Sequence, residues 1–162
     1  MRRPYWRFGE ALRYDRRRMR VLGVDLGRRR VGLAISDVSG TLARPLGTLT
    51  VENAEDAVSR VAAEVGRLSR EEDGLAAVVV GLPRRLDGTP NEQTELTQTF
   101  VAALGHRIDM PIACEDERLT SREAESRLAL RERDWRKRRR SIDAAAAAII
   151  LQDYLDRVRQ SS

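Results

Sequence analysis

The feature that most constrains this fold is an unbroken apolar run near the middle of the chain. Residues Leu75–Leu82 are all aliphatic or glycine, and Pro83 ends the run. A short apolar run that is rich in β-branched residues and stopped by proline indicates a strand covered on both faces. Such a strand needs helices above and below its sheet, so the run predicts an α/β fold with this strand at the centre.

Apolar periodicity predicts the elements on either side of this run. Two short apolar runs joined by a basic turn indicate a hairpin, at 21–27 and 31–37. After the hairpin the sequence predicts a strand at 45–51, a helix at 54–68, the central strand at 75–82 and a helix at 91–104. A strand at 112–114 and helices at 120–130 and 142–155 complete the chain. This order predicts a mixed five-stranded sheet, with three antiparallel strands followed by parallel ones, flanked by helices.

The sequence also predicts which way one helix faces and where the last helix begins. The helix at 91–104 is expected to direct Leu96, Phe100, Val101 and Leu104 inward. The alanine-rich last helix is expected to begin at Ile142-Asp143, directly after a basic segment.

Length and charge define the domain organisation. At 162 residues and 41% hydrophobic content, the chain suits one domain with its own core. Its net charge of +5 is concentrated in residues 1–18 and 131–140, which each hold seven basic side chains against two acidic ones. Segments of this kind commonly contact phosphate backbones. We expect residues 1–18 to be a flexible basic extension that folding does not require, and 19–162 to form the domain.

Composition also bears on the compartment. No apolar run is long enough to cross a bilayer, and the arginine-rich N-terminus lacks the apolar core of a signal peptide. We therefore expect a soluble cytoplasmic protein. The single cysteine, Cys114, cannot form an internal disulfide, and its apolar surroundings favour a packing role over that of a nucleophile.

Three acidic residues interrupt or adjoin apolar elements. Asp25 lies inside the first strand, Glu117 follows a short buried strand, and Asp143 begins an apolar helix. A sheet of the predicted order can bring the three together. Carboxylates that meet without a basic partner must share protons or bind a cation, and oxygen ligands suit Mg²⁺ or Mn²⁺. Such an ion can activate water and offset the charge on a phosphodiester during hydrolysis.

Four ordered motifs extend this interpretation. They are Val24-Asp25-Leu26-Gly27 with Val31-Gly32-Leu33-Ala34-Ile35-Ser36-Asp37, then Val80-Gly81-Leu82-Pro83 with Asp87-Gly88-Thr89, then Asp116-Glu117-Arg118-Leu119-Thr120-Ser121, and finally Ile142-Asp143-Ala144-Ala145-Ala146 with residues 150–155. Together they resemble the YqgF family, also called RuvX and grouped with Holliday junction resolvases. The resemblance implies a ribonuclease H-like fold and a nuclease that matures the 5′ end of the small-subunit ribosomal RNA precursor. It also implies an acidic site of Asp25, Glu117 and Asp143.

The sequence departs from the wider ribonuclease H-like pattern at one point. Members of that superfamily often carry a further carboxylate one helical turn after the last aspartate, where this chain has Ala146 and Ala147. A two-ion site would therefore need Glu115 or Asp116 as a substitute ligand.

Basic side chains supply candidate contacts to a nucleic acid, either precursor ribosomal RNA or branched DNA. They are Arg28, Arg29, Arg30, Arg118, Arg136, Lys137, Arg138, Arg139 and Arg140. Arg118 can hold a phosphate or pair with Asp116. Precursor trimming needs one active site and junction cleavage favours two, so the chain is expected to be a monomer or a homodimer.

Two other functions are compatible with parts of the sequence. A strand, an Asp-x-Gly turn and a second strand also resemble the phosphate-binding hairpin of sugar kinases and actin-like ATPases. Those proteins close two such domains around a nucleotide, whereas this chain has one copy. The other alternative is a non-catalytic RNA-binding factor in ribosome assembly that retains the carboxylates.

Overall fold

The computed structural model describes residues 6–8, 20–85, 87–117 and 135–161, and the side chains of 20–85, 87–117 and 141–161 among them. The helix expected at 120–130, and Arg118, lie outside the described residues. No helix in the described part of the chain is both long and apolar enough to span a membrane.

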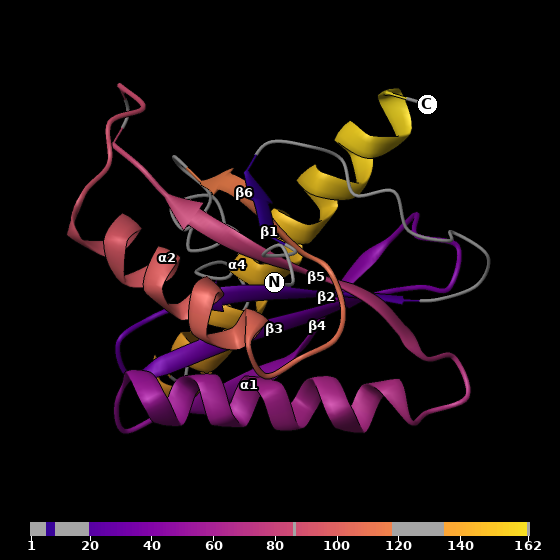
Figure 1. The fold of residues 1–162 in the computed structure, drawn as a ribbon, viewed down its shortest axis with the longest axis horizontal. Coiled ribbons are helices and arrows are strands. Elements are labelled where there is room, and N and C mark those ends of the chain that lie inside the picture. Colours follow the sequence, from indigo (N-terminus) through magenta and orange to yellow (C-terminus); the bar gives the residue numbers. More distant parts are fainter. Residues whose placement is uncertain (1–5, 9–19, 86, 118–134, 162) are drawn as a thin grey trace.

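A mixed sheet forms the centre of the molecule (Figure 1). Strands β2 (Arg20–Leu26), β3 (Arg30–Ser36) and β4 (Ala43–Thr50) are antiparallel neighbours. Strand β5 (Leu75–Pro83) pairs in parallel with β2, and β6 (Ile112–Glu117) pairs in parallel with β5. The order β6-β5-β2-β3-β4 places the apolar β5 between two parallel partners, which confirms the predicted fold class.

A sixth strand, β1 (Trp6–Phe8), extends the sheet beyond β6. It runs parallel to β6, with Trp6 opposite Ile112 and Phe8 opposite Cys114. The sequence predicts no element within residues 1–18, because these aromatic residues among arginines show no clear helical or strand period. The hydrogen-bonding groups of the β6 edge provide the template that the local sequence does not reveal.

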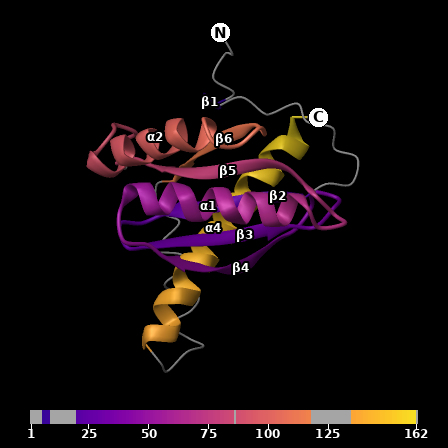
Figure 2. The same cartoon turned by 60° about the horizontal axis from the view of Figure 1, so that its bottom comes forward.

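Helices α1 (Ala54–Ser69) and α2 (Glu92–Gly105) cover one face of the sheet (Figures 1 and 2). Asn53 caps α1 by accepting a hydrogen bond from the Asp56 amide, and Asn91 begins α2 in a capping box with Thr94. Between these helices and the sheet lies the larger core, made of aliphatic residues with Phe100. Leu96 does not belong to it: the side chain expected to face inward is 42% exposed.

Helix α4 (Trp135–Gln160) crosses the opposite face (Figure 2). The expected start at Ile142-Asp143 is wrong, because the helix continues backward through the basic segment and its first turns extend past β4 (Figure 2). Arginine and lysine are good helix formers, so the run need not interrupt the helix. At Gly23 an added Cβ would lie 2.8 Å from the Leu151 Cβ, so the glycine lets α4 lie close on the sheet.

Candidate active site

The site begins where α4 passes over the β2–β3 pair. In β2, Val24 and Leu26 face the α1/α2 core, so strand alternation places the intervening Asp25 on the α4 side. Asp25 lies opposite Gly32 of β3 in the strand register. A Cβ built on Gly32 would lie only 2.0 Å from the backbone oxygen of Asp143. The missing side chain at Gly32 therefore allows the backbone of α4 to bring Asp143 directly over the strand pair that holds Asp25.

A second strand glycine positions Glu117. This residue ends β6 and is 9% exposed. A Cβ on Gly81 of β5 would lie 3.0 Å from Glu117 Oε2 and 2.5 Å from Ile150 Cδ1 of α4. The Glu117 carboxylate thus lies over β5, the strand between β6 and β2. Gly81 leaves the space that this carboxylate and α4 share.

The three carboxylates interact electrostatically. The pKa of Asp25 lies well above the ordinary range of an aspartate, first because burial disfavours the charged form, then because Glu117 and Asp143 repel it. The predicted convergence of the three residues therefore agrees with the structure. Asp25, in β2, is the carboxylate that both others act on.

Arg30 contacts this cluster directly. Its Nε donates to Asp143 Oδ2 at 2.7 Å, and both side chains are partly buried. The pairing joins the first residue of β3 to α4. It was not foreseen, because 113 positions separate the two residues and nothing local in the sequence links them.

The two carboxylates considered as substitutes for a fourth ligand have other partners. Glu115 Oε2 accepts from Arg157 of α4 at 2.5 Å, and Asp116 Oδ1 lies 2.9 Å from Arg84 Nε. The side chain of Asp116 therefore pairs with a residue that the sequence analysis did not name.

The residue types at this site suit a metal ion, whereas the positions of their side chains do not form a set of ligands. Three carboxylates are the oxygen ligands that Mg²⁺ and Mn²⁺ prefer, and the repulsion acting on Asp25 is the kind that a cation relieves. Among the residues that the structure describes, however, no three His, Cys, Asp or Glu side chains are arranged to hold an ion. Asp143 points one carboxylate oxygen at Arg30 instead. The residue types fit a divalent cation, and Arg30 holds one oxygen of the Asp143 carboxylate.

The candidate nucleic-acid contacts fall into three groups. Arg28 and Arg29 are exposed at the β2–β3 turn, and Arg28 NH2 lies 3.6 Å from Glu92 Oε2. Arg30 points into the acidic cluster instead. Residues Arg136, Lys137, Arg138, Arg139 and Arg140 lie in the first turns of α4, where the structure describes the helix but not their side chains.

Cys114 behaves as the sequence predicted. It is 6% exposed in the core, and burial is the main cause that raises the pKa of its thiol to about 12. A thiol that stays protonated at neutral pH is a poor nucleophile.

Comparison with known proteins identifies the family. The sequence model of RuvX, described as Holliday junction resolvase, matches residues 19–157. A relative from Anaeromyxobacter sp. (strain K), named "Putative pre-16S rRNA nuclease", is 42% identical over 139 residues, which are 86% of this chain and 98% of the relative. A relative of the same name from Geobacillus kaustophilus is 37% identical over 143 residues, covering 87% of this chain and all of the relative.

Solved structures include a more distant neighbour. Thermus thermophilus RuvC is 22% identical, with a TM-score of 0.49, over 87% of this chain and 97% of that one. The family match spans every strand and helix named above except β1 and the last residues of α4. The chain therefore belongs to the RuvX family.

Proposed function

We propose that this protein is a metal-dependent nuclease that hydrolyses phosphodiester bonds at the Asp25, Glu117 and Asp143 site. One observation carries the proposal: the pKa of Asp25 in β2 is raised first by burial and then by two carboxylates from other elements, Glu117 and Asp143, which lie over the same strands. Such a concentration of negative charge is unfavourable unless a cation joins it. Family membership gives the reaction class, because the family and its relatives are named as nucleases.

We assign metal binding, positioning and nucleic-acid binding to different residues of the chain. Asp25, Glu117 and Asp143 would hold Mg²⁺ or Mn²⁺, which activates water and offsets charge on the phosphodiester when bound. Arg30 holds the Asp143 carboxylate in place beforehand, so we assign it as a positioning residue. The exposed Arg28 and Arg29, Arg118 and the basic turns at 136–140 are proposed to contact the nucleic-acid backbone.

The favoured substrate is the small-subunit ribosomal RNA precursor, since the relatives are named putative pre-16S rRNA nucleases. Cleavage at its 5′ end is what the family resemblance implies. The reaction would then take place in the cytoplasm, and a monomer suffices because one strand is cut. Branched DNA is the second candidate, because the family description names the Holliday junction. That activity calls for a homodimer with two sites.

Metal-dependent cleavage of both substrates by purified protein tests the proposal. With Mn²⁺ or Mg²⁺ we expect cleavage of precursor RNA that carries the native 5′ flank, and loss of cleavage in Asp25→Asn. The matched control is Asp73→Asn, which makes the same change in an exposed loop and should leave cleavage intact. Absence of cleavage of either substrate by the wild type, with binding intact, would favour the non-catalytic assembly factor.

A further inference from the structure

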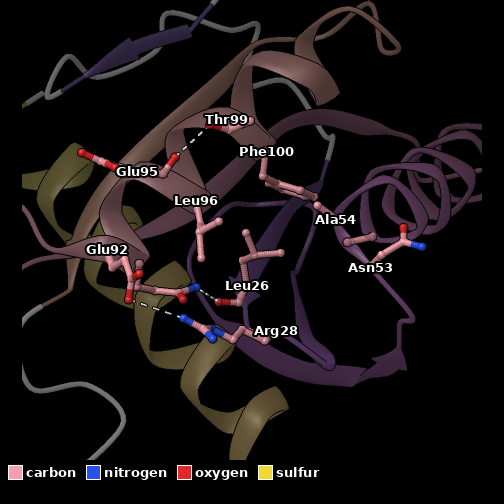
Figure 3. Close-up of a pocket in the computed structure, with 12 residues that line it drawn as sticks. Leu26, Arg28, Asn53, Ala54, Glu92, Glu95, Leu96, Thr99 and Phe100 are labelled. Carbon is pink, nitrogen blue, oxygen red and sulfur yellow. Dashed lines mark hydrogen bonds and ion pairs between the residues drawn. The ribbon is translucent and has the colours of Figure 1, made fainter.

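A pocket lies at the end of β2, on the opposite face of the sheet from the acidic cluster. Its volume is about 610 Å³, within the range of roughly 300–1,000 Å³ that is typical of small-molecule sites. Its floor is apolar, formed by Leu26, Ala54, Ala57, Leu96 and Phe100 (Figure 3). Figure 3 shows the side chains of Leu26 and Leu96 directed toward each other from β2 and α2.

Leu96 is the unusual member of this lining. It is one of two large apolar side chains that are strongly exposed among the described residues, and the other, Leu42, lies outside the pocket. Phe100, one helical turn further along α2, is only 4% exposed. An exposed leucine one helical turn from a buried aromatic ring leaves apolar surface that an occupant could cover.

The polar rim has a specific chemistry. Arg28 and Glu92 face each other at 3.6 Å, and their side chains are 71% and 85% exposed (Figure 3). An ion pair this exposed contributes little to stability, so either partner can exchange it for a ligand. Glu95, in contrast, points away from Leu96 (Figure 3). The rim therefore offers one cation and one carboxylate acceptor beside the apolar floor.

The pocket and the acidic cluster share one strand end. Leu26, Gly27 and Arg28 line the pocket and directly follow Asp25 in the chain. Because Asp25 and Leu26 are adjacent at this strand end, a polynucleotide strand with a phosphate at Asp25 that crosses the end of β2 can bring an adjoining base to the pocket. Arg28 can then hold the neighbouring phosphate, while the adjoining base turns away from the polynucleotide backbone toward the pocket.

We propose that the pocket binds one unpaired nucleobase of the substrate strand next to the scissile phosphate, and that it favours guanine. The base covers Leu96 and Leu26, as unstacked bases cover apolar side chains in single-strand recognition. The Glu92 carboxylate accepts two hydrogen bonds from the N1–H and amino group of guanine, a donor pair that uracil lacks. The inference rests on the proposed nuclease function, because that function places the strand at Asp25.

Binding in the absence of cleavage tests it. Wild-type protein in EDTA is mixed with short single-stranded RNAs in which 2-aminopurine occupies each position in turn. We expect the fluorescence of one position to change markedly. Guanine at that position should bind roughly fivefold or more tightly than uracil, in keeping with the energies of single base contacts.

Three variants make the result specific. Leu96→Ala should remove the fluorescence change and weaken binding, whereas Leu42→Ala, which truncates the other exposed leucine, should change neither. Glu92→Gln should keep the fluorescence change and lose the preference for guanine. A response that survives Leu96→Ala, or the absence of any responding position, would overturn the inference.

A parallel cleavage assay in the presence of metal distinguishes the base-pocket proposal from the nuclease proposal. Cleavage without a responding position would overturn the base pocket and leave the nuclease intact. A responding position that depends on Leu96, without cleavage under any metal, would support the base pocket and overturn the nuclease.

Discussion

Arg30 Nε lies 2.7 Å from Asp143 Oδ2, and this hydrogen bond ties the start of β3 to the helix on the far side of the sheet. The contact holds one carboxylate of the acidic cluster at a fixed place while the pKa of Asp25 stays raised beside it. A cation that enters the cluster therefore meets an Asp143 that is already oriented. Arg30 therefore connects the first residue of β3 to the acidic site.

Replacing this guanidinium tests its positioning role. Arg30→Ala should lower kcat by roughly 10- to 100-fold, the loss typical when an outer partner of a metal ligand is removed. It should also raise the Mn²⁺ concentration needed for half-maximal rate, with little change in RNA affinity. Arg30→Lys should recover part of the rate. Arg60→Ala, which breaks the surface pair with Asp56 on α1, is the matched control and should leave both quantities unchanged.

The pH dependence of the free energy of unfolding should reveal the cost of ionising Asp25 in the folded protein. Because its pKa is higher in the folded protein than in the unfolded chain, the folded state binds the extra proton, and stability falls as pH rises from about 4 through the raised value. Asp25→Asn should remove this fall and raise the melting temperature at pH 7–8 in metal-free buffer. Melting curves from pH 3.5 to 8.5 measure both. A variant less stable than the wild type at pH 8 would argue against the proposed repulsion.

Two glycine substitutions distinguish close approach from flexibility. Gly32→Ala should destabilise the fold by about 1–3 kcal/mol or more, the usual cost of overpacking, because its Cβ would meet the Asp143 backbone oxygen at 2.0 Å. Gly47→Ala, in the neighbouring strand β4, meets nothing within 4 Å and should be close to neutral. Urea unfolding compares the two. Equal effects would show that α4 does not lie on the β2–β3 pair as described.

Much of this organisation could be predicted from local sequence. Alternation and apolar runs gave the five main strands, and the expected helix starts at 54 and 91 lie within one residue of the starts of α1 and α2. The convergence of Asp25, Glu117 and Asp143 followed from sheet order. These features are local or follow from topology, so a single sequence carries them.

Other features depend on neighbours that are distant in the chain. The pairing of Arg30 with Asp143 depends on where α4 crosses the sheet. The exposure of Leu96 depends on which elements cover that side of α2. Gly32 and Gly81 gave a signal, since glycine inside a strand often marks a close approach, but the approaching helix could not be identified. Gly27, unlike Gly32 and Gly81, is required by the turn in which it lies, because a Cβ there would meet the Arg30 carbonyl oxygen at 2.6 Å.

The N-terminal extension allows a test of the domain boundary. We propose that a chain beginning at Met19 folds, because β1 adds only three residues at the edge of the sheet and the family match begins at residue 19. Its melting temperature should lie within a few degrees of the full-length value. Failure of the shortened chain to give a cooperative transition would show that β1 is part of the essential fold.

The central claim is that three carboxylates form one metal site, and anomalous scattering from crystals soaked in Mn²⁺ measures this most directly. We predict an anomalous peak bound by Asp25 together with Glu117 and Asp143, with Asp143 contacting the ion through its second carboxylate oxygen while Oδ2 stays on Arg30. The peak should vanish in Asp25→Asn. Crystals that show no Mn²⁺ at these residues, under conditions in which the dissolved protein cleaves RNA, would contradict it.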